Sequence, residues 1–331
     1  MPNLEMNLEA LWYGKSPKAL LLLPLSKLFS LLVSVRRRAY RLGLLKVHRL
    51  AVPVIVVGNV TVGGTGKTPL VAYLVDYLQR HGYRPGIVSR GYGGEASLWP
   101  QQVRPDSDPR IVGDEAVLLA RRCRCPMAVG PDRVAAAQAL LQYHDCNIIV
   151  SDDGLQHYAL GRDIEIVVID GIRRFGNGLC LPAGPLREPV KRIQQADMVV
   201  VNGLAGRGEY SMQLSGRQLV NLTDARQTRD LDNLRGQSVH AIAGIGNPKR
   251  FFDKLQQLGI RVIEHPFPDH HPYHREEVTF NDDLPVLMTE KDAVKCERFA
   301  GPDYWYLPVN TAMGAEFTSA LEKLLKGKEH G

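Results

Sequence analysis

The stretch VPVIVVGNVTVGGTGKTP, residues 52–69, carries the strongest structural signal in the sequence. Its first half is a run of β-branched residues that predicts a buried strand, and its second half is rich in glycine. The common phosphate-binding loop, G-x-x-x-x-G-K-[ST], has glycine where this chain has Thr61, and the chain matches the rest through Gly66, Lys67 and Thr68. A strand before this loop and a helix after it provide the context that a nucleotide site requires, which leaves a ligand-free turn as the minor alternative.

The loop residues have distinct expected roles. Backbone N–H groups turned inward by glycines, together with a helix N-terminus, would surround phosphate oxygens. Lys67 would reach the β- and γ-phosphates, and the Thr68 hydroxyl would ligate Mg²⁺. The predicted nucleotide-binding residues are Thr61, Val62, Gly63, Gly64, Thr65, Gly66, Lys67 and Thr68.

Short apolar runs alternate with helical segments along the chain, which indicates an α/β fold. Five runs predict a parallel sheet: 52–60, 86–91, 147–153, 164–170 and 197–203. A polar, irregular stretch at 204–236 precedes further strand and helix patterns, with a last helix over 315–325. We therefore expect a P-loop NTPase-like parallel sheet core over 51–203, a second, smaller α/β domain over 204–331, and a separate N-terminal arm over 1–50.

Composition places the positive charge in the arm. The net charge is +6, yet residues 1–50 hold nine Lys or Arg against two Glu, so the rest of the chain is close to neutral. The five cysteines form no CxxC pair, which argues against a zinc site or a disulfide framework and favours a reducing compartment.

The arm contains an apolar run over 19–35 that is shorter than the ~20 residues needed to span a bilayer. Pro24 and Lys27 interrupt it, and an arginine cluster follows it, unlike a secretory signal. Its helical periodicity places Leu25, Leu28, Phe29, Leu32 and Val35 on one side, and Ser26, Ser30, Ser34, Arg37, Arg38 and Arg41 on the other. Two interpretations stay open, a helix on an anionic membrane surface and a helix packed on the protein's own core. Nucleic acid is not an expected partner, because exposed aromatics are not interleaved with the basic residues.

Acidic residues follow two of the predicted elements. NIIVSDDG at 147–154 is a strand ending in Asp152 and Asp153, typical of a strand whose carboxylate holds Mg²⁺. If the strand continues, the two side chains point to opposite faces and only one meets the metal directly. Asp114 begins an apolar helix, where it is either a stabilising first-turn acid or the base that orients an acceptor hydroxyl.

Three loops offer further candidates. SRGYGG at 89–94 presents Arg90, and LPAGPLREP at 181–189 presents Arg187, whose guanidinium could neutralise phosphate charge. FPDHHPYH at 267–274 clusters three histidines without the ligand set of a zinc site, so we expect a loop histidine that assists proton transfer with Asp114. TEKD at 289–292 differs from the guanine-reading NKxD in its second residue and is discounted.

Taken in order, GNVTVGGTGKTP, SRGYGG, GDE, SDDGLQH, LPAGPLREP, FPDHHPY and MTEKDAVK resemble the tetraacyldisaccharide 4′-kinase family of lipid A biosynthesis over nearly the whole chain. The family's phosphate loop itself has the TVGGTGKT form. The resemblance implies transfer of the γ-phosphoryl of ATP to the 4′-hydroxyl of a lipid A disaccharide 1-phosphate, giving lipid IVA. It also implies a location on the cytoplasmic face of the inner membrane, with no obligate protein partner.

The resemblance carries roles to matching residues, with ATP and Mg²⁺ as cofactors. Asp114 would act as base with a histidine of the DHH segment, His270 or His271, of which we favour His270. The expected catalytic residues are Asp114, His270, His271, Lys67 and Arg187; the expected metal-site residues are Thr68, Asp152, Asp153 and Glu115; the expected supporting residues are Arg90, Gln156, His157 and Glu188. The rival from another class is a membrane-surface P-loop ATPase that positions water instead of a lipid acceptor.

Overall fold

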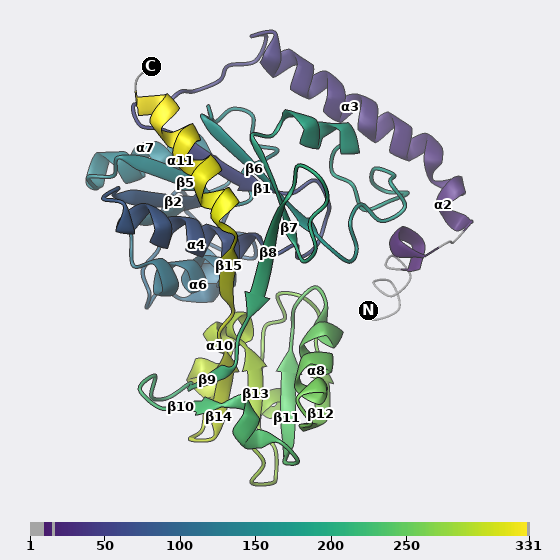
Figure 1. Cartoon of the computed structure of the whole chain (residues 1–331), viewed down its shortest axis with the longest axis vertical. Helices are drawn as coiled ribbons and strands as arrows, with labels where there is room; N and C mark the ends of the chain where they lie inside the picture. Colours follow the sequence, from purple (N-terminus) through teal and green to yellow (C-terminus); the bar gives the residue numbers. More distant parts are fainter. Residues whose placement is uncertain (1–9, 15–16, 330–331) are drawn as a thin grey trace.

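The computed structural model describes residues 10–14 and 17–329, so residues 1–9 and 15–16 of the predicted arm lie outside the described residues. The described ranges contain two sheets, and the larger one is a nine-stranded mixed sheet (Figure 1). Its strands are β1 (Val54–Gly58), β2 (Pro85–Ser89), β3 (Gln101–Gln102), β4 (Met127–Val129), β5 (Ile148–Ser151), β6 (Ile164–Asp170), β7 (Met198–Asn202), β8 (Tyr210–Ser215) and β15 (Asn310–Met313). They lie in the order β15-β8-β7-β6-β1-β5-β2-β4-β3, parallel except for β3 and β15. The predicted parallel sheet is confirmed, and β1, which leads into the phosphate loop, lies at its centre between β5 and β6.

Helices cover both faces of this sheet. They are α4 (Lys67–Arg80), α5 (Pro109–Val112), α6 (Asp114–Cys123), α7 (Arg133–Tyr143), the short η1 (Val190–Gln195) and α11 (Ala315–Glu329). In α4 the fully buried residues recur at the spacing of one helix face, namely Leu70, Val71, Leu74, Val75 and Leu78. They join α6 and α11 in the largest apolar cluster, whereas α7 packs in a separate cluster with other residues of β1 and β5. This packing fixes the first turn of α4 against the sheet edge where the loop emerges.

A second, six-stranded sheet forms a smaller α/β unit below the first in Figure 1. Its strands are β9 (Gln218–Asn221), β10 (Thr228–Asp230), β11 (Ser238–Ala243), β12 (Arg261–Pro266), β13 (Val286–Thr289) and β14 (Tyr304–Leu307), in the order β10-β9-β14-β13-β11-β12. Its helices are η2 (Leu231–Leu234), α8 (Pro248–Gln257), α9 (Arg275–Val278), α10 (Glu290–Cys296) and η3 (Glu297–Phe299). The predicted strand and helix patterns of this region correspond to β11, α8, β12, β13 and β14.

The sheets divide the chain differently from the predicted boundary near residue 204. Strand β8 follows that boundary, yet it pairs with β7 in the first sheet, and the second sheet begins at β9. After β14 the chain returns, and β15 and α11 add to the first sheet and its core. The stretch 204–236, read as irregular, contains β8, β9 and β10, which are short and partly exposed and therefore lack a clear apolar pattern. The division into domains at 51–203 and 204–331 stays a prediction. Two strands after residue 204, β8 and β15, nevertheless belong to the first sheet.

The N-terminal arm forms α2 (Lys18–Leu21) and the 19-residue α3 (Leu23–Arg41), which lies along the outside of the first sheet (Figure 1). The serine-bearing side of α3 faces the protein: Ser26 is buried and its hydroxyl donates to the Cys180 carbonyl at 2.7 Å. Phe29, which the periodicity groups with the apolar side, is half-buried in a cluster with Leu155 and Leu186. The periodicity separates two faces of α3 without showing which one packs on the protein, and in the structure the serine-bearing face does so.

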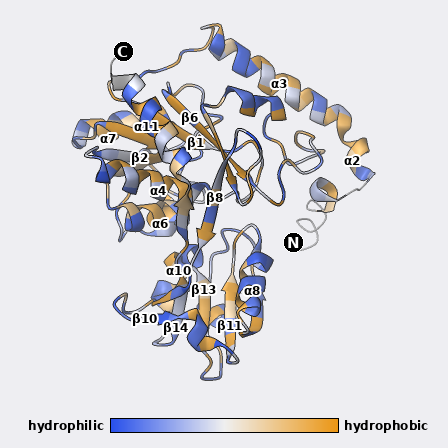
Figure 2. Ribbon diagram, viewed as in Figure 1, coloured by the Kyte–Doolittle hydropathy of each residue, from blue (hydrophilic) through white to orange (hydrophobic). Residues whose placement is uncertain are grey.

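The opposite side of α3 exposes its leucines. Leu25, Leu28, Leu31, Leu32 and Val35 are each more than half exposed. Figure 2 shows apolar and hydrophilic residues alternating along α3. Of the helices in the described part of the chain, none is both long and apolar enough to cross a membrane.

Gly58 ends β1 where the segment after β5 crosses close to it, which generates a stability prediction. A Cβ at Gly58 would lie 2.5 Å from the Leu155 Cβ and 2.9 Å from the Leu155 backbone nitrogen. We expect Gly58→Ala to lower the free energy of unfolding by about 1–3 kcal/mol, because the backbone cannot give way cheaply. The matched control is Gly86→Ala in β2, where the three atoms nearest to the new Cβ belong to the side chains of Leu140, Cys146 and Ile149. Equal losses in thermal unfolding for the two variants would refute this constraint.

Candidate functional site

The phosphate loop leaves β1 at its carboxyl end and opens directly into α4. Gly63 and Gly66 have φ of 94° and 93°, backbone angles that side-chain-bearing residues rarely adopt, and Gly66 caps α4. Gly63 and Gly64 are exposed, and a Cβ at either would meet no atom within 4 Å, so the loop backbone borders open space. Thr61 instead anchors the loop by pairing with Leu186, and the Val62 N–H donates to the Pro185 carbonyl at 2.8 Å. The arrangement is that of a phosphate cradle at a helix N-terminus.

Lys67 and Arg187 both reach Asp153. The Lys67 ammonium lies 3.5 Å from Asp153 and donates to Asn59 at 3.2 Å, and the Arg187 guanidinium lies 3.0 Å from Asp153. Burial opposes ionisation of Asp153, but Lys67 and Arg187 outweigh it and lower the pKa of this carboxyl to about 2. The expectation that Asp152 and Asp153 alternate along a continued strand is corrected, because β5 ends at Ser151 and Asp153 turns away with φ of 48°.

Asp152 has the properties of the metal-facing carboxylate. It is almost fully buried, and its Oδ1 has no hydrogen-bond partner among the described residues. Burial, with the negative charges of Glu115 and Asp153, raises the pKa of Asp152 to about 7. A cation would remove that cost, so the donor set fits Mg²⁺. Within the described ranges no three His, Cys, Asp or Glu side chains converge as a complete metal site, which suits an ion that completes its shell with phosphate oxygens and water.

A carboxylate and a histidine from different sheets meet at the same edge. Asp114, the first residue of α6, is buried, and its two oxygens lie 3.0 and 3.1 Å from His270 Nδ1. His270 follows β12 and holds φ of 61°, an uncommon angle for a residue with a side chain. The pairing of Asp114 with the histidine segment is therefore present, and the histidine is His270.

Lys291 lies beside the Asp114–His270 pair. It belongs to TEKD, a stretch that was discounted as a guanine-reading motif. Its ammonium donates to Glu115 at 2.9 Å and to Asp269 at 2.9 Å, and it lies 3.3 Å from His270 Nε2. Because an ammonium only donates, His270 Nε2 accepts, and the ring proton lies on Nδ1, directed at Asp114. Glu115 is thus held by Lys291, beside the expected metal site.

The charges around the pair set its protonation. Burial favours the neutral acid of Asp114, but the His270 hydrogen bond and the charge of Lys291 hold its pKa at about 2. Burial would lower the pKa of His270, and the hydrogen bond to Asp114 offsets this, so the pKa is raised. Burial likewise opposes the charge on Lys291, while Glu115 and Asp114 raise its pKa. An ionised carboxylate at this edge can accept a hydrogen bond from a substrate hydroxyl.

His271 does not join the site, which corrects its inclusion among the expected catalytic residues. Its Nε2 donates to Glu277 at 2.9 Å, and its ring stacks on Phe267. Adjacent residues direct their side chains apart, so only one of the two histidines can face Asp114. His274 caps the short α9 instead.

The remaining expected residues form a network that leads away from the loop. Gln156 donates from Nε2 to the Asn59 carbonyl and to Glu188, both at 3.0 Å. Glu188 is fully buried and also accepts from the Tyr158 hydroxyl. Arg187 and Glu188 therefore point in different directions. Arg187 faces the phosphate site, and Glu188 faces the protein interior.

Two expected residues lie beside an arginine that the sequence analysis missed. Arg90 is exposed. Burial of Arg133, and next in size the positive charge of Arg90, lower the pKa of Arg133 to about 10. His157 lies 3.9 Å from Asp132, and burial together with Arg133 lowers the pKa of His157 to about 4. Arg133 begins α7 and is buried near the charges of Asp152 and Asp153, and the GPDR turn before it was the only signal of its place.

The second sheet reaches the phosphate loop through the turn after β11. A Cβ at Gly246 would lie 3.3 Å from the Gly64 backbone nitrogen. Buried Asp292 fixes this turn by accepting the Gly244 N–H at 3.0 Å and the Tyr273 hydroxyl at 2.9 Å. TEKD thus supplies Lys291 to the Asp114 pair and Asp292 to the turn.

The raised pKa of Asp152 generates a prediction for the protein without ligands. Its folded-state pKa exceeds the ordinary 3.8, so ionisation costs stability as pH rises from about 4 through about 7. Asp152→Asn removes that cost, and we expect it to raise the free energy of unfolding by about 1–2 kcal/mol at pH ~8.5 and less at pH ~5. The same variant should lose the stabilisation that magnesium with ATP gives the wild type. Thermal unfolding with and without magnesium and ATP measures both effects, and an equal gain at the two pH values would contradict the assignment.

The chain matches the family model "Tetraacyldisaccharide-1-P 4'-kinase" (LpxK) over residues 18–326. It is 56% identical to the tetraacyldisaccharide 4′-kinase of Nitrosococcus oceani over 95% of this chain and 93% of that protein. It is 54% identical to the tetraacyldisaccharide 4′-kinase of Methylobacillus flagellatus over 96% of this chain and 94% of that protein.

A solved structure is similar over the same extent. It is LpxK from Aquifex aeolicus in complex with ATP, with a TM-score of 0.79 and 31% sequence identity, covering 93% of this chain and 98% of that chain. Family model, relatives and structure agree with one another and with the phosphate loop described above. The chain therefore belongs to the tetraacyldisaccharide-1-phosphate 4′-kinase family.

Proposed function

We propose that the chain transfers the γ-phosphoryl of ATP to the 4′-hydroxyl of a tetraacylated glucosamine disaccharide 1-phosphate, with Asp114 as the base. The observation that carries this proposal is the buried, ionised Asp114 paired with His270 at the sheet edge that holds the phosphate loop. A kinase needs a carboxylate there to orient the acceptor hydroxyl and to take its proton late in transfer. A pKa of about 2 keeps Asp114 ionised at neutral pH, so that it can accept the hydroxyl's hydrogen bond.

The surrounding side chains divide the remaining work. Lys67 binds the β- and γ-phosphates, and Arg187 offers a guanidinium to charge that develops on the transferred group. Asp152 and Thr68 would hold Mg²⁺, with Glu115 beside them, and the ion would neutralise charge on the phosphate oxygens. Asp153, already engaged by Lys67 and Arg187, acts on the orientation of those cations. His270 and Lys291 position Asp114 and keep its negative charge.

The N-terminal helix places this site at a lipid surface. The exposed leucine side of α3 would lie in the interface of an anionic membrane, on the cytoplasmic face of the inner membrane where ATP is present. The inward side of α3 connects to the site network, because Arg37 lies 3.8 Å from Glu188 and Arg36 donates to the Gln156 carbonyl. An acylated acceptor could then reach the loop without leaving the membrane. An ATPase that only positions water has no need of this arrangement.

Asp114→Asn tests the base directly. The amide keeps the size of the carboxylate but cannot take a proton, so we expect kcat to fall about 10²–10⁴-fold. The dissociation constant for ATP should stay within about twofold, because the base acts after nucleotide binding. Steady-state kinetics and nucleotide titration measure the two effects, with exposed Asp283→Asn as the matched control. A parallel loss of ATP affinity would show that Asp114 supports the nucleotide site instead.

Lys291 is proposed as a positioning residue, with a pH signature. Its charge lowers the pKa of His270 and of Asp114, so its removal should raise both. In Lys291→Met the acid limb of the kcat profile should therefore move to higher pH, by about one unit or more, with a modest change in the ATP KM. Lys291→Arg keeps the charge and should leave the limb near its wild-type position. A uniform loss of activity at every pH in both variants would indicate a purely structural role.

A further inference from the structure

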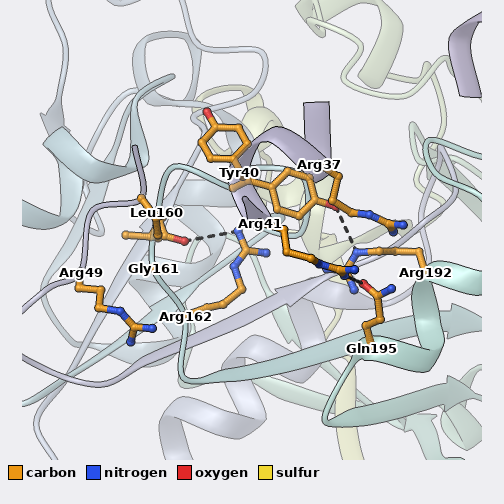
Figure 3. Close-up of a pocket in the computed structure, with 11 residues that line it drawn as sticks. Arg37, Tyr40, Arg41, Arg49, Leu160, Gly161, Arg162, Arg192 and Gln195 are labelled. Carbon is orange, nitrogen blue, oxygen red and sulfur yellow. Dashed lines mark hydrogen bonds between the residues drawn. The ribbon is translucent and has the colours of Figure 1, made fainter. Parts of the chain in front are cut away.

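A pocket of about 230 Å³ lies under the carboxyl-terminal half of α3, outside the phosphate site (Figure 3). It is formed by α3 and the segment after it, by η1, and by the segment before β6. Its basic residues come from α3, the segment after α3, the segment before β6 and η1, namely Arg37, Arg41, Arg49, Arg162 and Arg192. Figure 3 shows Arg41, Arg192 and Gln195 close together on one side, with Arg49 and Arg162 on the other.

The pocket lies toward the end of the sheet remote from the phosphate loop. Gly161 donates its N–H to the His48 carbonyl, and Asp163 donates to the carbonyl of Val54, the first residue of β1. The loop begins after the last residue of β1, and a strand of this length spans about 16 Å at ~3.3 Å per residue. A group bound beside Gly161 is therefore well separated from the reacting phosphate.

Positive charge in the pocket exceeds the negative charge that contacts it. Arg192 lies 2.6 Å from Glu165 and 3.5 Å from Glu188, and Arg162 lies 3.1 Å from Glu165. Arg41 donates to the neutral Gln195 at 2.8 Å. Among the described residues neither Arg41 nor Arg49 has a carboxylate partner within ion-pair distance. Five guanidinium groups thus share two carboxylates, which favours an anionic ligand.

One buried donor is left without a partner. The side chain of Arg192 is 3% exposed, and its Nη1 donates to no acceptor in the described part of the protein. Buried donors are nearly always satisfied, and guanidinium groups bind phosphate with two parallel hydrogen bonds. The surroundings of Arg192 are therefore suited to phosphate oxygens.

The pocket opens beside exposed apolar residues, which indicates the rest of the ligand. Leu42, Leu44 and Leu45 follow α3 and are 67%, 75% and 40% exposed, and Val47, which lines the pocket, is 41% exposed. Arg41 and Arg49 bracket this segment. A polar anionic group in the pocket with an apolar chain beside it is the geometry of a lipid in the membrane interface.

We propose that this pocket binds the phosphate of an anionic bilayer phospholipid, as a lipid site separate from the acceptor. The inference rests on the proposed position of α3 on a membrane. A bound headgroup would fix the depth and rotation of α3. Because Arg37 of α3 contacts Glu188, it would also fix the network that runs from Glu188 through Gln156 to the phosphate loop.

The test compares two double variants of the full chain that remove the same charge from α3 and the segment after it. Arg41→Gln with Arg49→Gln removes pocket arginines, whereas Lys27→Gln with Arg38→Gln removes exposed charges of α3 outside the pocket. Flotation measures binding to vesicles of phosphatidylcholine alone and of phosphatidylcholine with phosphatidylglycerol. We expect the wild type to prefer the anionic vesicles by about tenfold or more, since each basic residue near such a surface contributes about fivefold. The Arg41→Gln, Arg49→Gln variant should lose at least about fivefold more of this preference than the Lys27→Gln, Arg38→Gln variant.

The outcomes separate the pocket from the membrane placement. If the wild type binds neither vesicle, the placement of α3 fails, and the pocket proposal fails with it. If the wild type binds and both double variants lose the preference equally, the attraction is diffuse and only the pocket is refuted. The acceptor KM in neutral detergent micelles should stay within about twofold for the pocket variant. A large rise in that KM would assign the pocket to the acceptor's own phosphate and overturn the proposal.

Discussion

The hydrogen bond between Asp114 and His270 joins the two sheets of this kinase at the place where chemistry occurs. Asp114 belongs to a helix packed on the first sheet, and His270 to a loop of the second. Buried carboxylates need partners, and here the partners are His270, Lys291 and Lys295, all from the second unit. The same unit brings Gly246 next to the phosphate loop. A change in the position of the second sheet would therefore alter the base and the nucleotide cradle together.

Local patterns predicted the parts of the molecule whose reasons are local. The phosphate loop, its strand and α4 follow from consecutive residues, and β5 with its two aspartates follows from one apolar run. The pairing of Asp114 with a histidine 156 residues away was expected from the chemistry of the two side chains and from the family motifs, because no local pattern links them. Spacing could not choose between His270 and His271, because the choice depends on the left-handed backbone of His270. Lys291 was missed because TEKD was compared only with the guanine-reading NKxD, and Arg133 was missed because its segment carries no phosphate-binding or metal-binding pattern.

The N-terminal helix shows the limit of periodicity from another side. Alternating faces were recognised, but docking is decided by close approach, and Ser26 permits α3 to lie near the Cys180 carbonyl where a larger side chain would not. The leucines on the opposite side of α3 therefore remain exposed and do not pack in the protein core. On the inward side Arg37 contacts Glu188, and Glu188 and Gln156 connect this side to the segment that precedes the phosphate loop.

The central claim is that this site transfers phosphate to a lipid hydroxyl instead of to water. The most direct measurement follows ADP formation with and without tetraacyldisaccharide 1-phosphate, together with the mass and fragmentation of the recovered lipid. We expect ADP formation to depend on the lipid, and each ADP to be matched by one phosphate on the 4′-oxygen. ADP formed at the same rate without the lipid, with no phosphate on the recovered lipid, would contradict this claim.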